Sequence, residues 1–438
     1  MTIGFIPVPA AGAVNAHLSG CLHRIVRRRD QPRQQPHKAT AIRALDIAQE
    51  NGVSSSNHQR TATTTNTLDF PSPHRLLTVN SAPQLALRYG FPVVTQPADN
   101  YVAIIELITP GGSGWSKDDF KTYCEQLEIP VPPMHELSVR GAKNTFTGNA
   151  AGSADVEFAL DMQVIAGATL GTVQLLMIYA PGDKFGIKDA LQAVLNFEDV
   201  DKVSAVSLSW GFSEAQAGEE LAQACDKVLQ ALLDKGITVF AASGDDSARD
   251  QDPDSNKGLN ADYPAASPYA FGCGATTITN NDIITEKAWS SGGGGVSMFS
   301  PVPKWQVDAA KGVDGSQGMR CVPDGAMVGD PQSGYSVICA GRQMVLGGTS
   351  AVAPMWAAWK GLTDAVAGKR LPFSAEAVYT GPAACLTDIT TGNNGTYNAQ
   401  IGYDLCTGMG VPNAEFTAAW LRMNGVTWSP STQPAVVS

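Results

Sequence analysis

The stretch VSAVSLSWGFSEAQAGEELAQACDKVLQALLDKGITVFAAS, residues 203–243, decides the fold. Two short β-rich runs, 203–210 and 237–243, are apolar at almost every position, and an amphipathic helical pattern at 214–235 joins them. The helical pattern opens with Ser-Glu-Ala-Gln at 213–216, which is typical of a capping box. Strands that are apolar on both faces and joined by helices indicate a parallel sheet covered on both sides.

The same alternation continues outward along the chain. Three more runs have a β-rich apolar character: 102–108, 173–180 and 269–277. Three more segments have helical periodicity: 154–166, 187–196 and 350–366. We therefore expect an α/β fold with a doubly wound, mostly parallel sheet and helices on both faces.

The first 76 residues differ from the rest. Residues 24–38 are basic and rich in Pro and Gln, residues 53–67 are polar, and residues 39–50 have the pattern of one short helix. Such composition buries too little apolar surface to fold alone. We expect a low-complexity, mostly disordered lead segment at 1–76, a folded domain at 77–425 and a flexible tail at 426–438.

Charge and hydropathy exclude some classes of partner. The 438 residues carry a net charge of −11, but residues 1–75 hold nine basic and four acidic residues while the remainder holds twenty-one basic and thirty-seven acidic. An acidic main part argues against nucleic-acid binding, which depends on basic surface. No apolar run approaches the ~18–20 residues of a spanning helix, so we expect a soluble protein without a membrane partner.

The cysteines and the N-terminus leave the cellular compartment open. Eight cysteines are too few for a disulfide scaffold in a chain of this length, and none forms a Cys-x-x-Cys pair. Cys385 and Cys406 could form a disulfide bond, and the alternative is that both are buried thiols. The weakly apolar residues 4–14 follow no basic residue, so no clear signal peptide is present.

The motif GGTSAVAP at 347–354 is the first candidate for chemistry. It places Ser350 at the start of an apolar helix, where the helix dipole favours negative charge on the hydroxyl oxygen. The preceding glycines allow a substrate backbone to approach. The alternative is a simple N-cap serine, which is common before helices.

A nucleophilic serine needs a base, and histidine is the usual one. Five of the six histidines precede residue 76, and the remaining one, His135, stands in a Pro-rich stretch without helix or strand signal. Glu157 and Asp161 lie four residues apart on a predicted helix and therefore share a face. Their apolar neighbours suggest burial, where two carboxyls can share a proton; the alternative is a solvated acidic face.

A third acid, Asp245, follows the β-rich run at 237–243. Ligands of open parallel sheets bind at the carboxyl ends of strands. Other aspartates follow at 246, 250, 252 and 254, so the alternative is a solvated acidic loop.

Taken together, these motifs resemble the sedolisins, the serine-carboxyl peptidases with a subtilisin-like fold. The resemblance runs over about residues 83–410. It rests on the segments GGTSAVAP (347–354), EFALD (157–161), ASGD (242–245), SLSWG (207–211), DYPAASPY (262–269), GGGGVS (292–297) with PKWQ (303–306), and TDI…GYDLCTGMG (387–410).

The resemblance implies a role for each matched acid. Ser350 would attack the scissile carbonyl, Glu157 would accept its proton, and Asp161 would orient Glu157. Asp245, in its protonated form, would donate a hydrogen bond to the oxyanion, a type of contact whose loss costs ~10²–10³ in turnover. Further matched positions extend this set: Glu106 and Trp210 in the carboxyl network, and Ser209, Trp210 and Gly211 along the peptide substrate.

The resemblance also implies one bound Ca²⁺ near the C-terminus. Asp388 and Asp404 would contribute carboxylates, and Ile389, Gln400 and Gly402 would contribute main-chain carbonyls, a donor set that suits calcium. The alternative is a pair of turn aspartates beside glycines. Family members usually have glycine at the position of Gln400, which is acceptable unless the backbone there needs a positive φ.

Three departures from the family pattern stand out. Ser247 replaces a glycine after the third acid, and Gly325 follows Pro-Asp where valine is usual. The family also has a large folded propeptide, which residues 1–76 cannot form, so this segment is either its remnant or its replacement.

We expect an acid-acting endopeptidase that binds peptide or protein substrates as a monomer, in a secreted or periplasmic location. Alternatives are an inactive relative that binds peptides, a tripeptidyl-peptidase of the same family, a subtilase with His135 as base, and a calcium-dependent binding module.

Overall fold

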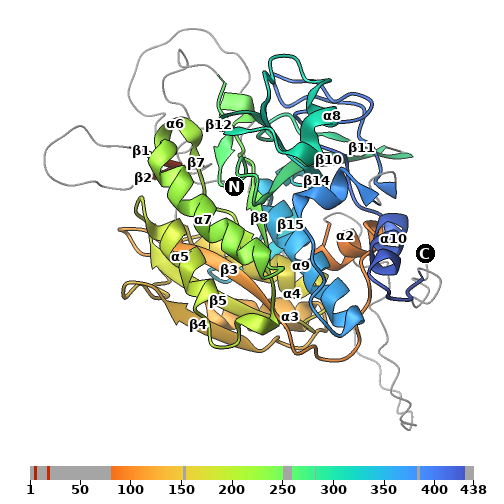
Figure 1. The fold of residues 1–438 in the computed structure, drawn as a ribbon. Helices are drawn as coiled ribbons and strands as arrows, with labels where there is room; N and C mark the ends of the chain where they lie inside the picture. Colours follow the sequence, from red (N-terminus) through yellow and green to blue (C-terminus); the bar gives the residue numbers. More distant parts are fainter. Residues whose placement is uncertain are drawn as a thin grey trace, which may run out of the picture.

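The computed structural model describes residues 4–6, 17–19, 80–150, 154–249, 259–281, 283–381 and 385–429 (Figure 1). Two short strands, β1 (Gly4–Ile6) and β2 (His17–Ser19), pair antiparallel within the lead segment. The rest of that segment, with the helix expected at 39–50, lies outside the described residues, and so does the end of the tail.

Within the described residues, eight strands form one sheet, in the order β11-β10-β8-β6-β3-β5-β4 with β14 also beside β10. Their bounds are β3 (Tyr101–Ile108), β4 (Met134–Ser138), β5 (Gln174–Pro181), β6 (Val203–Leu208), β8 (Thr238–Ala242), β10 (Phe271–Asn281), β11 (Ile283–Ala288) and β14 (Gly325–Val328). Every pair is parallel except β10 with β11. The expected doubly wound, mostly parallel sheet is confirmed.

Helices cover both faces of the sheet. The helices α4 (Asp155–Ala168) and α9 (Thr349–Ala367) pack together on one face, and α5 (Gly186–Leu195) and α7 (Glu219–Asp234) pack together on the other (Figure 1). Every residue of α4 is buried, because it is also covered by α2 (Ala82–Arg88), α3 (Lys117–Gln126) and a β-hairpin. A helix without a solvent face explains why acidic residues on it can be buried.

The remaining elements are short. Besides β1 with β2, three pairs of described strands lie outside the main sheet: β7 (Phe212–Ser213) with β9 (Asp262–Tyr263), β12 (Gly295–Pro301) with β13 (Met319–Val322), and β15 (Tyr335–Cys339) with β16 (Arg342–Leu346). The last helices are α6 (Glu214–Ala217), α8 (Val307–Ala310) and α10 (Ala414–Met423). Short 3₁₀ turns are η2 (Val200–Lys202), η3 (Ser247–Arg249), η4 (Lys304–Gln306), η5 (Pro331–Ser333) and η6 (Ala375–Val378).

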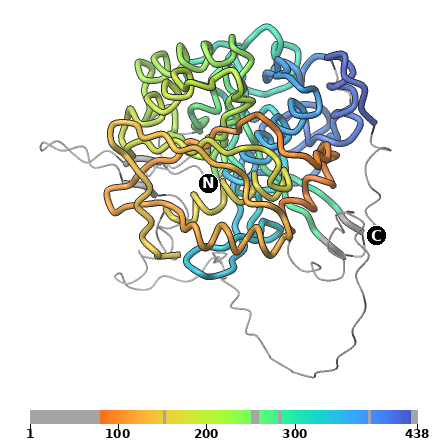
Figure 2. Tube along the Cα trace, turned by 90° about the horizontal axis from the view of Figure 1, so that it is seen from below, coloured from red at the N-terminus to blue at the C-terminus, as the bar shows by residue number. Residues whose placement is uncertain are grey.

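The two ends of the folded part meet. In Figure 2 the orange segment that contains α2 lies beside the blue segment that contains α10, and both are neighbours in Figure 1 as well. Gly90, just after α2, approaches Ala414 at the start of α10 so closely that a Cβ on this glycine would collide with it. Residues from 80 onward therefore belong to the same packed domain as residues near 420.

Two sequence expectations are wrong in detail. The helix expected at 214–235 is broken at Gly218, where φ is 73°, into α6 and α7. Ser213 makes no side-chain cap, and Glu214 turns instead to accept hydrogen bonds from Ser297 Oγ and the Met298 amide, both at 2.6 Å. The Pro-rich stretch around His135 is not a loop but the edge strand β4.

An aromatic cluster lies beneath α9. Trp356 and Trp359 are fully buried on this helix. Trp356 packs on Phe271 with ring centroids 4.8 Å apart, and Trp359 packs on Phe373 at 5.0 Å. This cluster fixes α9 against the sheet. Among the described helices, none is long and apolar enough to cross a membrane.

Candidate active site

The expected site residues lie at the carboxyl edge of the sheet. In the sheet, β3 lies between β5 and β6. The strands β3 and β6 are therefore neighbours, although β4 and β5 come between them in sequence. Ligand sites in open α/β sheets lie at such a change of direction. Glu106 near the end of β3, Ser209 after β6 and Asp245 after β8 all belong to this edge, where α9 also begins.

Ser350 is the second residue of α9 and is fully buried. The turn before it depends on glycines. Gly348, with φ 117°, donates its amide to the carbonyl of Gly329 at 2.5 Å, and a Cβ on Gly347 would collide with the same carbonyl. Ser350 is thus held at a helix N-terminus by a turn that other residues could not form.

Helix α4 brings Glu157 and Asp161 to the same place, and the structure rules out a solvated acidic face because their exposed fractions are 1% and 0%. Burial raises the pKa of Glu157 to about 7; the nearby Ser350 hydroxyl lowers this pKa and the charge of Asp245 raises it. Glu157 therefore lies near the hydroxyl of Ser350 and near the third acid, Asp245.

Ser209 connects Asp161 to the serine. Its hydroxyl donates to Asp161 Oδ1 at 2.9 Å and lies 3.2 Å from the carbonyl oxygen of Ser350. Burial and the charge of Glu157 raise the pKa of Asp161 well above its ordinary value, and the hydrogen bond from Ser209 lowers it. The family resemblance predicts that Ser209, Trp210 and Gly211 lie along the peptide substrate. In the structure these three residues connect β6 to β7. No pattern in the sequence indicated this side-chain contact.

Glu106 extends the group of acids. It is fully buried on β3 and accepts a hydrogen bond from Trp210 Nε1 at 3.0 Å. Burial raises the pKa of Glu106 strongly, and the charges of Asp161 and Glu157 raise it further. The hydrogen bond from Trp210 lowers this pKa. Three carboxyl groups thus interact in a buried site, which favours their protonated forms.

Asp245 is attached to the residue before the serine. Its Oδ1 accepts hydrogen bonds from the Thr349 amide at 2.7 Å and from the Thr349 hydroxyl at 2.9 Å. The same hydroxyl accepts the amide of Gly244 at 3.1 Å. Thr349 is a positioning residue that was not predicted, although its place in the Gly-Gly-Thr-Ser motif was the available signal. The acidic residues at 250, 252 and 254 lie outside the described residues.

His135 is remote from this site. It is exposed on the edge strand β4, beside Tyr101 and Phe197 at ring-centroid distances of 5.3 and 6.3 Å. In the sheet, His135 pairs with Leu176 on β5, and Leu176 pairs with Ala103 on β3. Ala103 is three residues before Glu106. The position of His135 therefore does not fit the role of a base for Ser350.

The segment expected to bind calcium, residues 388–404, is a loop whose carboxylates accept hydrogen bonds from its own main chain. Asp388 Oδ2 accepts the amide of Gly402 at 2.8 Å, and Asp404 Oδ2 accepts the amide of Gln400 at 3.1 Å. Two carboxylates thus border one exposed loop that also includes carbonyls. Gln400 is not among the described residues with positive φ, so its replacement of glycine causes no strain.

The donors at this loop fit a hard cation. They are all oxygens, and two are carboxylates, which is the chemistry that calcium prefers. Within the described ranges, no three His, Cys, Asp or Glu side chains converge on one point, so a cation here would depend on main-chain carbonyls such as that of Ile389. Cys385 and Cys406 are both free thiols, so the disulfide alternative does not form.

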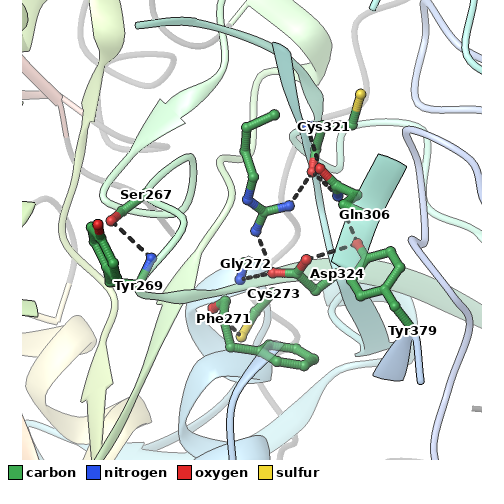
Figure 3. A network of polar contacts seen from close by, with 10 residues as sticks. Ser267, Tyr269, Phe271, Gly272, Cys273, Gln306, Cys321, Asp324 and Tyr379 are labelled. Atoms are coloured by element: carbon green, nitrogen blue, oxygen red, sulfur yellow. Dashed lines mark hydrogen bonds and ion pairs between the residues drawn. The ribbon is translucent and has the colours of Figure 1, made fainter. Parts of the chain in front are cut away.

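A buried network lies between this loop and the sheet (Figure 3). Asp324 pairs with Arg320 at 2.6 Å, and both side chains have no exposed surface. Its carboxylate also accepts the Gly272 amide at 2.7 Å and the Tyr379 hydroxyl at 2.8 Å, while its carbonyl accepts the amide of Met409 at 2.9 Å. The segment after Asp404 is thereby attached to the start of β10.

The departure at Gly325 has a packing reason. A Cβ at this position would lie 3.1 Å from the Phe271 ring and 3.2 Å from the Trp356 ring. These distances are tighter than ordinary van der Waals contact, so the two aromatic rings occupy the space that a larger residue would need.

Comparison with known proteins identifies relatives over most of the chain. The model of the subtilase family (peptidase S8) matches residues 147–379. Kumamolisin from Bacillus sp. (strain MN-32) is 35% identical over 346 residues, which are 75% of this chain and 61% of that protein. Sedolisin from Pseudomonas sp. (strain 101) is 26% identical over 349 residues, which are 73% of this chain and 58% of that protein. The chain thus spans about three fifths of the length of these two relatives.

A solved structure supports the fold assignment. Pseudomonas sedolisin, a serine-carboxyl proteinase complexed with two molecules of pseudo-iodotyrostatin, superposes with a TM-score of 0.68 and 23% identity. The match covers 80% of this chain and 99% of that chain. The subtilisin-like fold is confirmed.

Proposed function

Because the chain belongs to the subtilase family and, within it, to the sedolisins, we propose that it is a serine-carboxyl endopeptidase active in acid. The observation that carries the proposal is the position of Glu157, a buried carboxyl group with a pKa of about 7, near the Ser350 hydroxyl. Glu157 and Asp161 interact and are buried together, so one of them can hold a proton while the other accepts the proton of the Ser350 hydroxyl, which allows the pair to act in acid.

In the proposed reaction, Ser350 Oγ attacks the carbonyl carbon of the scissile peptide bond while Glu157 accepts the hydroxyl proton. The tetrahedral intermediate expels the amine, which receives the proton from Glu157, and an acyl-enzyme remains on Ser350. Glu157 then deprotonates a water molecule that attacks the ester, and the acid product leaves as the proton returns to Ser350. Asp161, fixed by Ser209, would orient Glu157 throughout.

Asp245 would stabilise the negative oxygen of the intermediate. Its Oδ1 accepts both bonds from Thr349, which hold the carboxyl group beside the turn that carries Ser350. Because the buried pair Glu157 and Asp161 must share a proton in this mechanism, we expect activity to fall as the pH approaches neutrality. Glu106, bonded to Trp210, would extend the proton-sharing group behind Asp161.

We further propose that one Ca²⁺ stabilises the loop of residues 388–404. The carboxylates of Asp388 and Asp404 and the carbonyls of Ile389, Gln400 and Gly402 would hold it. Its contribution would be structural: it would neutralise two acids that face one loop and would take no part in proton transfer.

The test is hydrolysis of an internally quenched peptide between pH 3 and pH 8. We expect an optimum well below pH 7, loss of at least 10³-fold in turnover for Ser350→Ala and Glu157→Gln, and no change for the exposed control Glu125→Gln on α3. An optimum at neutral or alkaline pH would falsify the acid mechanism. Loss of turnover in His135→Ala would favour a histidine-dependent subtilase instead.

Two further measurements distinguish an active enzyme from a binding protein and an endopeptidase from an exopeptidase. Labelling by a fluorophosphonate that disappears in Ser350→Ala would exclude an inactive peptide-binding relative and a calcium-binding module. Mass spectrometry of a digested protein substrate would show internal cleavage for an endopeptidase, whereas release of tripeptides from N-termini would show a tripeptidyl-peptidase.

A further inference from the structure

A β-hairpin leads directly into the turn that carries Ser350. Its strands β15 and β16 span residues 335–346, and the motif Gly-Gly-Thr-Ser follows at once. This hairpin is a two-stranded sheet on its own in the described part of the chain. Two strands alone are only marginally stable, so other elements must hold this hairpin.

The side chain of Gln163 clamps the middle of the hairpin. Its Nε2 donates to the Ile338 carbonyl at 2.7 Å, and its Oε1 accepts the Ile338 amide at 2.8 Å. These two bonds imitate the pairing of a neighbouring strand. Gln163 has an exposed fraction of 1% and lies on α4, two residues after Asp161.

The tip of the hairpin is held by another helix. Asp119 on α3 accepts the amides of Ala340 and Gly341 at 2.8 and 2.9 Å. Both turn residues have positive φ, 51° and 70°, which directs their amides to the same side. The hairpin is therefore attached at its tip as well as at its centre.

Apolar contacts bring the hairpin onto the residues around Glu157. Cys339 packs in one buried cluster with Val156 and Ala159, which lie on either side of Glu157 in sequence. Met344 and Leu346 border this cluster, and Leu346 is the last strand residue before the glycine turn. The hairpin thus contacts the turn of α4 that carries the base and continues into the turn that carries the nucleophile.

We propose that the hairpin of residues 335–346 is a positioning strap that sets the separation of Glu157 and Ser350, with Gln163 as its main positioning residue. This inference rests on the proposed peptidase function. Gly347 and Gly348 allow the backbone before Ser350 more conformations than other residues would, and the strap restricts these conformations. A displacement of about 1 Å in such a pair can reduce turnover by ~10²-fold.

The test variant is Gln163→Met, which keeps the side-chain volume and removes both hydrogen bonds. We expect kcat on the quenched peptide to fall about 10-fold or more, with KM within about twofold, because the substrate contacts are unchanged. Hydrogen exchange of the peptide containing Ile338 should accelerate. The control is Gln192→Met, the same replacement at an exposed position of α5, which should leave kcat, KM and exchange unchanged.

A second variant keeps the inference testable if Gln163→Met does not fold. Asp119→Asn removes one of the two acceptors at the tip, and a smaller loss of kcat, about threefold, with unchanged KM is expected. Faster exchange at Ile338 with unaltered kcat in Gln163→Met would overturn the strap and leave the peptidase function intact. Absence of turnover in the wild-type chain under all conditions would overturn both.

Discussion

The carboxyl group of Glu157 determines how the folded chain responds to pH. Burial raises its pKa from 4.5 to about 7, so the folded protein holds this proton more tightly than the unfolded chain does. The resulting stability is fully present below pH 4.5 and is lost as the pH rises through about 7. Asp161 and Glu106 act in the same direction.

Glu157→Gln should therefore flatten the pH dependence of stability. One pKa unit corresponds to about 1.4 kcal/mol, so the contribution of Glu157 is on the order of 3 kcal/mol at most. Thermal unfolding at pH 4.5 and pH 7.5 should show a smaller decrease in Tm for Glu157→Gln than for the wild type. The exposed Glu125→Gln should behave like the wild type; equal decreases in all three proteins would contradict the assignment.

Ser247 stands where a left-handed backbone favours glycine. Its φ is 62°, two residues after Asp245. Ser247→Gly should remove about 1 kcal/mol of backbone strain from the folded state. Glycine also raises the conformational entropy of the unfolded chain, which costs a similar free energy, so stability should stay within about 0.5 kcal/mol of the wild type. Ser247→Val should cost about 2 kcal/mol in urea unfolding, because a β-branched residue tolerates this region poorly. Equal stability of the two variants would show that the φ value carries no strain.

The sequence patterns could predict the acidic residues of the site but not the polar groups that hold them in place. Glu157 and Asp161 could be found because their spacing puts them on one helix face and because apolar neighbours predict burial. The hydroxyl of Ser209, the amide of Gln163 and the hydroxyl of Thr349 could not, because each acts across the fold on a residue at least 48 positions away in sequence. Long-range hydrogen bonds of this kind leave no periodic pattern along the chain.

At the scale of elements, burial explains which strands and helices could be predicted. The five expected strands and the helices α4 and α9 lie in the centre of the fold, where apolar runs are continuous, and α5 buries one apolar face that gives it helical periodicity. The edge strand β4, by contrast, consists only of half-buried and exposed residues and contains few apolar positions. The hairpins were not foreseen either, because side chains from other elements stabilise them.

The break between α6 and α7 depends on one glycine. Gly218 has φ 73° and ψ 151°, a region that residues with a Cβ rarely enter. A Cβ there would meet no atom within 4 Å, so Gly218→Ala should lose about 1–2 kcal/mol through backbone strain alone. Gly111→Ala is the control, since that Cβ is equally uncrowded and the residue is not among those with positive φ. Chemical denaturation of both variants checks the difference, and equal stabilities would contradict the account.

At the scale of the whole molecule, the candidate calcium loop is attached to the strands that lead to the candidate active site. The carbonyl of Asp324 accepts the Met409 amide, and its carboxylate holds the start of β10, which pairs with β8 before Asp245. A cation that orders the loop should therefore stabilise the entire domain. Stability from a ligand grows with its concentration, reaching about 2.7 kcal/mol at 100 times Kd.

Removal of calcium should lower Tm by several degrees. Differential scanning calorimetry with EGTA and with millimolar Ca²⁺ should show an increase of about 5 °C with the cation in the wild type. Asp388→Asn should abolish most of this increase, because the replacement removes a carboxylate that accepts only one hydrogen bond in the described structure. Asp314→Asn, an exposed acid outside the loop, should keep the full increase. An undiminished increase in Asp388→Asn would place the ion elsewhere.

The aromatic cluster beneath α9 reports on the helix that carries the proposed nucleophile. Trp356 and Trp359 are sealed from solvent only six and nine positions beyond Ser350, so their indole emission should be strongly blue-shifted in the native state. Loosening of that helix would redden and quench the signal. The integrity of the proposed catalytic centre can thus be followed by ultraviolet spectroscopy in samples that contain no substrate at all.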